Sequence, residues 1–423
     1  MSQYDALHEA IARIWDELPE LFGALWEATD LAMLPLLRSL DGDEHDEAED
    51  EIYELFRPVP QALERLNRVL SELIAHPVRG DATAAGEIPR RRQHERYVSM
   101  PVLYATDRAP DTSRDGSTHY TGTRGDRLRT GLAIVTIPDD HRMGKLERPR
   151  IWRCEFRENP ARHVIVLEVN ELASDRFVET ARAMVETAGT PESLIFIHGF
   201  RVDFLTALRR TAQVAYDLAF AGVPMLYSWP SPAKVLRYVT DEATIRWTEA
   251  HFREFVELTA TQLGLEVVHI VAHSMGNRVL AETLGSTPGL GAAQAGARLD
   301  QIVFAAPDID SDTFRQLATQ FTGRAGRVTL YSSSKDVALE TSHKVHGYPR
   351  AGDSGEGLVV VAGVDTIDVT AVDTSLMGHS YYGDNRSVLS DLFAVIHGGR
   401  SPSERFGLIQ RSIAPGDYWE FRP

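Results

Sequence analysis

Apolar residues along the first 80 positions recur at intervals of three or four. Two such series run through this segment: Leu18, Leu21, Phe22, Leu25 and Trp26, then Leu63, Leu66, Val69, Leu70 and Leu73. Because this spacing lines one face of a helix, we expect residues 1–80 to form a small all-helical domain. The acidic run between the two series, DGDEHDEAEDE at 41–51, has the composition of a solvated loop.

The pattern changes after a polar segment at 81–96, DATAAGEIPRRRQHER, which has no apolar period and is expected to be a linker. Short, continuous apolar runs follow, and helical patterns separate the later ones. Strands are expected at 101–106, 131–138, 163–169, 193–200, 223–230, 267–274, 301–308, 327–333 and 366–372. Helices are expected at 205–219, within 242–263, at 277–284 and near 311–320.

Continuous apolar runs are typical of parallel strands that helices bury on both faces. We therefore predict an α/β domain over residues 97–400, with a mostly parallel sheet, flanking helices and leading antiparallel strands. The tail at 401–423, which contains Pro402 and Pro415, is expected to be an extended C-terminal segment.

Charge and composition narrow the classes of partner. The chain carries 44 basic and 61 acidic residues, a net charge of −17. This balance argues against nucleic acid as a partner and against simple docking on anionic lipid. The single cysteine, Cys154, excludes an intramolecular disulfide and a Cys-rich zinc site. With no signal-peptide pattern and no apolar stretch of about 20 residues, we expect a cytoplasmic protein without a membrane span.

Ser274 is the candidate nucleophile. It lies in Ala272-His273-Ser274-Met275-Gly276, where an apolar strand pattern ends and a helical pattern begins. A serine hydroxyl becomes nucleophilic when a base takes its proton and donors stabilise the oxyanion. A sharp strand-to-helix turn with small neighbours presents a serine for this chemistry. The alternative is a structural serine in an ordinary turn.

The oxyanion hole of such a turn uses two backbone N–H groups. One is expected from Met275, and the other from Phe200 in the earlier turn IHGF. Gly199 allows close approach there. His198 is expected to shape this loop or border a substrate pocket, although it also competes for the role of base. Trp229 either lines an acyl pocket or packs in the core.

The acid and the base are expected after the serine, at the ends of later strands. Asp336 follows the strand at 327–333, while Asp308 follows the preceding strand and competes for the same role. His379 follows the last strand and is favoured as the base. His343 and His346 come before that strand and are its competitors.

Six segments occur together and in order: IFIHGFRVDF, YSWPSPAKVLRYVTDE, VHIVAHSMGNRVL, FAAPDID, YSSSKDVAL and GHSYY. With PVLYATDR and GLAIVTIP, they resemble a family of bacterial α/β-hydrolases of unknown function in the esterase/lipase superfamily. The resemblance covers roughly residues 97 to 395. It implies an α/β-hydrolase fold with a triad at Ser274, Asp336 and His379, and it accommodates alanine at position 272.

These observations lead to an expected serine hydrolase that cleaves small-molecule or lipid esters without metal or cofactor. No zinc, P-loop or dinucleotide motif occurs in the chain. The same triad would equally serve a thioesterase, peptidase or acyltransferase. A different class of function is a non-catalytic binding or signalling module. In either case, residues 1–80 are candidates for recruiting a protein partner or restraining the enzyme.

Overall fold

The computed structural model describes residues 96–111, 118–149, 158–231, 238–287, 296–336, 339, 348–355, 357–372 and 386–422. All of them belong to the second of two units into which the chain divides, Asp81–Pro423. The helices expected in 1–80, the acidic run, nearly all of the linker, Cys154, His343, His346 and His379 lie outside the described residues.

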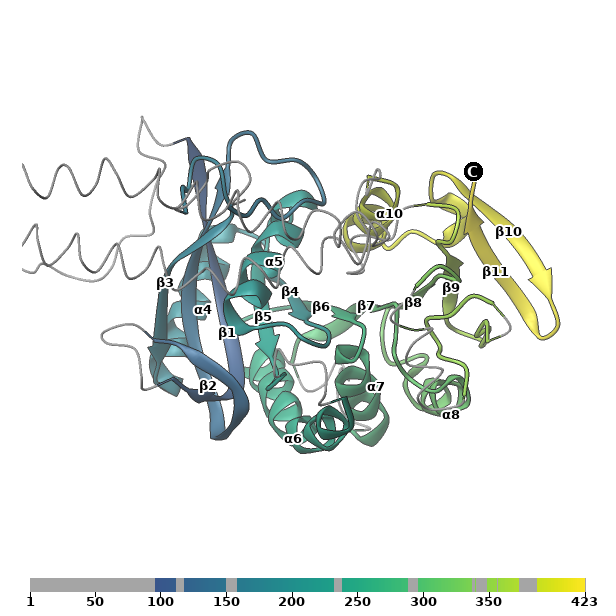
Figure 1. The fold of residues 1–423 in the computed structure, drawn as a ribbon, viewed down its shortest axis with the longest axis horizontal. Coiled ribbons are helices and arrows are strands. Elements are labelled where there is room, and N and C mark those ends of the chain that lie inside the picture. The colour runs from purple at the N-terminus through teal and green to yellow at the C-terminus, as the bar shows by residue number, and fades with distance from the viewer. Residues whose placement is uncertain are drawn as a thin grey trace, which may run out of the picture. The chain divides into compact units, whose positions relative to one another are not determined.

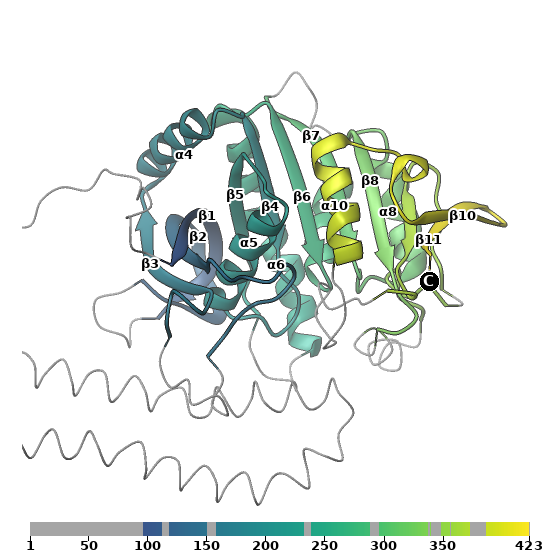
Figure 2. The same cartoon turned by 90° about the horizontal axis from the view of Figure 1, so that it is seen from above.

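Within the described residues, eleven strands form one sheet (Figures 1 and 2). In order across the sheet they are β10 (Leu408–Ile413), β11 (Gly416–Phe421), β9 (Asp365–Asp368), β8 (Arg327–Ser332), β7 (Arg298–Ala305), β6 (Val267–His273), β4 (Glu192–Ile197), β5 (Val223–Ser228), β1 (Tyr97–Pro110), β2 (Tyr120–Pro138) and β3 (Ile165–Leu172). Pairing is parallel from β11 to β1 and antiparallel at both ends. The predicted parallel sheet with leading antiparallel strands is confirmed.

Alternating side chains along each central strand enter two different cores. On β4, Ile195 and Ile197 join one core, while Leu194 and Phe196 join the other. The first core contains buried residues of α4 (Ser174–Ala188), α6 (Tyr238–Gln262), α7 (Gly276–Ser286) and α8 (Ser311–Phe321). The second contains those of α5 (Phe204–Asp217) and α10 (Arg386–Gly398). Helices thus cover both faces of the sheet, which explains why its strands read as continuous apolar runs.

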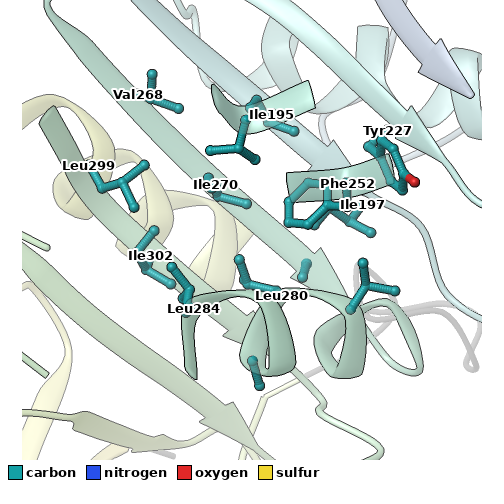
Figure 3. Packing of buried hydrophobic residues seen from close by; sticks show 14 of the residues in the cluster. Ile195, Ile197, Tyr227, Phe252, Val268, Ile270, Leu280, Leu284, Leu299 and Ile302 are labelled. Atoms are coloured by element: carbon teal, nitrogen blue, oxygen red, sulfur yellow. The ribbon is translucent and has the colours of Figure 1, made fainter. Parts of the chain in front are cut away.

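Figure 3 shows the first core where α7 packs below β6. Ile270 of β6 lies among Ile195, Leu299 and Ile302 from neighbouring strands, and Leu280 and Leu284 of α7 close the core from below. All six side chains are at most 3% exposed. This packing fixes the position of α7 against β6, and hence the turn between them.

The C-terminal tail differs from the extended segment expected at 401–423. A short 3₁₀ helix, η4 (Pro402–Glu404), precedes the β10–β11 hairpin. Strand β11 continues the sheet, because Trp419 and Glu420 pair in parallel with Ile367 and Asp368 of β9. Burial of Phe421 and Leu408 in the second core holds the hairpin to the sheet.

His141 forms ion pairs with two carboxylates outside the sheet. Its Nδ1 lies 2.7 Å from Glu147 Oε2 and its Nε2 lies 2.9 Å from Asp217 Oδ1. Burial disfavours the imidazolium, but the hydrogen bonds to Asp217 and Glu147 outweigh it and raise the pKa of His141 to about 9. These ion pairs therefore stabilise the folded protein fully below the unfolded pKa of about 6.5, and their contribution disappears as the pH rises through about 9.

We expect His141→Gln to lower the free energy of unfolding by about 2 to 3 kcal/mol at pH 6 and by much less at pH 9.5. Urea unfolding of both proteins at the two pH values measures the difference. Equal losses at both pH values would show that His141 does not carry its charge in the folded protein.

Candidate active site

The carboxyl ends of the central strands are aligned with one another. Ile197 of β4 is paired with Tyr227 of β5 on one side and with Ala272 of β6 on the other. Beyond β6, His273 is paired with Ala305 of β7, which in turn is paired with Tyr331 of β8. The turns after these strands consequently meet along one edge of the sheet, where α/β proteins bind their ligands.

Ser274 occupies a strained turn between β6 and α7. Its φ is +48°, in the left-handed region that non-glycine residues rarely adopt. The Ser274 N–H donates to Ala305 O at 3.0 Å, and the Asn277 side-chain amide donates to Ser274 O at 2.8 Å. Such strain costs about 1 to 3 kcal/mol, persists where the surroundings enforce it, and clusters at functional sites. The expected strand–serine–helix turn is therefore present.

Two glycines bring the turn after β4 against Ser274. A Cβ on Gly276 would lie 2.4 Å from His198 O, and a Cβ on Gly199 would lie 2.9 Å from Ser274 Cβ. Neither approach leaves room for a side chain. Phe200 directly follows Gly199 in the chain, and Met275 directly follows Ser274.

Gly276→Ala is expected to destabilise the protein by about 1 to 3 kcal/mol, because the new methyl group meets a backbone carbonyl that cannot move independently. Gly285→Ala is the matched control in the same helix, since its Cβ meets the flexible end of Leu317. Denaturant unfolding of both variants measures the contrast. A Gly276→Ala protein as stable as the Gly285→Ala protein would contradict the close approach.

His198 is a buried, neutral group in this structure. Burial, reinforced by the nearby Arg108 guanidinium, lowers the pKa of His198 to about 3. The ring stacks on Trp229 with centroids 5.3 Å apart, and Trp229 Nε1 donates to His198 O at 2.8 Å. Both side chains are at most 1% exposed. With its pKa so low, the imidazole is poorly suited to take a proton near neutral pH.

The two candidate acids have different surroundings. Asp308 Oδ1 lies 3.2 Å from Arg350 Nε and 3.7 Å from Arg278 Nη2. The Asp308 N–H also donates to Ser274 O at 3.3 Å, so its backbone supports the serine turn. Asp336 follows β8 and accepts a hydrogen bond from the Leu339 N–H at 3.1 Å. His379, the candidate base, lies outside the described residues.

Arg108 is a buried residue close to the candidate site that was not predicted from the sequence. It follows the apolar run of β1, is 1% exposed, and bonds to groups in the turn after β4 and at the end of β5. An arginine shortly after a continuous apolar run was the available signal, because a buried guanidinium requires several fixed acceptors. Neighbouring Thr106 and Asp107 are also completely buried, so three consecutive polar residues of β1 are buried near the carboxyl edge of the sheet.

Within the described residues, no helix is long and apolar enough to cross a membrane. The same residues contain no group of three or more His, Cys, Asp or Glu side chains that could hold a metal ion.

Comparison with known proteins places this fold in a family. The profile described as alpha/beta hydrolase of unknown function (DUF900) matches residues 174–396, more than half of the chain and the span that contains Ser274, Asp336 and His379. No curated protein matches. Among solved structures, a predicted cell surface hydrolase from Lactobacillus plantarum WCFS1 is 12% identical, with a TM-score of 0.31, over 50% of this chain and 92% of that chain. By the profile match, the chain belongs to this family of alpha/beta hydrolases of unknown function.

Proposed function

We propose that the protein is a serine hydrolase that cleaves carboxylic esters, lipid esters among them, through an acyl-enzyme at Ser274. The observation that carries this proposal is the serine turn: a φ of +48° between a buried parallel strand and a helix. A sharp strand-to-helix turn with a strained serine is the arrangement that presents a nucleophile at a sheet edge.

In the proposed reaction, Ser274 Oγ attacks the ester carbonyl while His379 takes its proton. His379 then protonates the leaving alcohol, and a water molecule activated by the same base releases the acid. Asp336 holds the imidazole in the tautomer whose Nε2 can accept the proton. Asp336 follows β8, which is separated from β6 by one strand, so Asp336 and Ser274 both follow strands at the carboxyl edge of the sheet.

The environment of the carboxylates supports Asp336 over Asp308 as the orienting acid. Arg350 and Arg278 flank the Asp308 carboxylate, so its charge already serves these two ion pairs. The proposed oxyanion donors are the N–H groups of Met275 and Phe200. Met275 immediately precedes α7, and the N–H groups at the start of a helix lack intrahelical acceptors and carry the positive end of its dipole.

A fluorophosphonate probe tests the nucleophile. The full-length protein should be labelled, and mass spectrometry of its peptides should place the label on Ser274; a label elsewhere would refute the assignment. A panel of p-nitrophenyl esters of rising chain length, with phospholipids and thioesters, then identifies the acyl group. Hydrolysis of the thioesters alone would move the activity to another bond type with the same triad.

A non-catalytic binding module is the rival from a different class. It would leave the probe and every ester unreacted while residues 1–80 capture a protein partner. A combined role, in which these residues recruit or restrain the hydrolase, predicts that their removal changes activity or partner binding.

A further inference from the structure

The hydrogen bonds of His198 determine which of its ring nitrogens carries the proton. Nδ1 lies 2.8 Å from Gly199 O, and a carbonyl oxygen can only accept. Nδ1 is therefore the protonated nitrogen. Nε2 lies 3.1 Å from Arg108 Nη2, and a guanidinium can only donate, so Nε2 accepts. The two neighbours thus specify the same neutral tautomer, which also agrees with the low pKa of His198.

The bond from His198 to Gly199 O has a consequence for Phe200. The Gly199 carbonyl and the Phe200 N–H belong to one planar trans peptide group, so they point in opposite directions. Fixing the carbonyl therefore fixes the N–H. Gly199 lies close to Ser274, because a Cβ at this position would be only 2.9 Å from Ser274 Cβ.

Arg108 holds the rest of this turn. Its Nη2 donates to Val202 O at 2.6 Å, and its Nε donates to Ser228 Oγ at 2.8 Å. Arg201, which directly precedes Val202, has a strained backbone with φ at +58°. Its N–H donates to Ser231 Oγ at 2.9 Å. The guanidinium therefore connects the turn after β4 to the end of β5 and opposes relaxation of the strained segment.

We propose that Arg108 and His198 form a relay that orients the Phe200 N–H toward the oxyanion of the Ser274 reaction. Both are positioning residues: Arg108 acts on His198 and Val202, and His198 acts on the Gly199–Phe200 peptide. This inference rests on the proposed function, because it assigns a task to the Phe200 N–H.

The tautomer is tested first, on the unmodified protein. Nitrogen-15 NMR of histidine-labelled full-length protein, with His198→Asn to assign the signals, should show His198 as the neutral Nδ1–H form from pH 8 down to pH 5. An Nε2–H tautomer, or an imidazolium that forms near pH 6.5, would overturn the relay whether or not the protein reacts with esters.

The kinetic test measures labelling of Ser274 by a fluorophosphonate probe, whose phosphoryl oxygen occupies the oxyanion position. His198→Phe keeps an aromatic ring to stack on Trp229 but loses both nitrogens. We expect its kinact to fall by about 10²-fold, with KI and the pKa of the pH profile unchanged, since a small misplacement of a catalytic group has an effect of that size. His198→Asn restores an amide donor near the Nδ1 position and should recover at least about tenfold of that loss.

Arg108→Met should lower kinact in the same way as His198→Phe. Arg129→Met is its matched control, because Arg129 is 8% exposed and pairs with Asp126 and Glu171 at β2 and β3, away from the serine turn. It should react within about twofold of wild type, as expected for a residue outside the site.

Each outcome has a distinct meaning. If wild-type protein is not labelled at Ser274, the proposed function fails and this inference with it. If wild type is labelled and folded His198→Phe reacts within about twofold of it, only the relay fails. Thermal unfolding identifies variants that do not fold, and in that case the tautomer measurement and His198→Asn decide.

Discussion

Replacing Ser274 by alanine is expected to lower kcat for ester hydrolysis by about 10⁶-fold, to the level supplied by binding and the oxyanion donors. The reason is that covalent catalysis has no substitute nucleophile in the turn: His273 and Met275 flank the serine, and the turn after β4 contributes Gly199. Initial rates on the best ester of the panel, with active-site titration of the wild type, measure the ratio.

Ser274→Gly adds a second, opposite expectation. Glycine adopts positive φ without strain, so this variant should be as inactive as Ser274→Ala and more stable than wild type by about 1 kcal/mol. Ser286→Ala, in the last turn of α7, controls for loss of a serine hydroxyl outside the site. Retained activity in Ser274→Gly, or a drop in its stability, would contradict a strained nucleophile turn.

The central strands could be predicted from local sequence, because a strand that is buried on both faces is a run of consecutive apolar residues. Val268, Ile270 and Val271 are all buried, the first two in one core and the third in the other, so no alternation was needed to recognise β6. Helices α4 and α10 were missed. In α4 the buried residues Phe177, Ala181 and Met184 are spaced four and three positions apart, so the pattern of a helix face was present in the sequence and was overlooked.

Long-range pairing explains the other differences. Strands β1 and β2 extend well beyond their apolar runs, to Pro110 and back to Tyr120, because their polar ends pair with each other across a bulge near Arg108. The hairpin β10–β11 joins the sheet through β9, about 50 residues earlier in the chain. Hydrophobic periodicity carries no information about such partners.

The candidate site likewise combines features that local sequence predicts with features that depend on long-range contacts. The serine turn could be read from five residues because its strain and its glycines are local. The different surroundings of the two carboxylates could not, because they depend on Arg350, which reaches Asp308 from a later loop. The contact between Arg108 and His198 could likewise not be predicted, since 90 residues separate the two in sequence. Pairings of this kind become visible only when the strand order is known.

Asp336→Asn is expected to lower kcat by about 10⁴-fold with little change in stability. An asparagine side-chain oxygen can still accept the Leu339 N–H, so the loop after β8 keeps this hydrogen bond. In the proposed mechanism, the substitution removes the negative charge that orients the imidazole and stabilises its protonated form. Rates on the best ester, together with denaturant unfolding, separate the two effects.

Asp308→Asn is the matched variant at the end of the neighbouring strand, and the opposite balance is expected of it. It deprives Arg350 and Arg278 of a buried negative charge, so stability should fall by about 3 kcal/mol or more. Its folded fraction should retain far more activity than Asp336→Asn, because the Asp308 carboxylate serves the arginines and its backbone N–H, which remains in place, supports the serine turn. If instead Asp308→Asn were stable and inactive, and Asp336→Asn active, the triad acid would be Asp308.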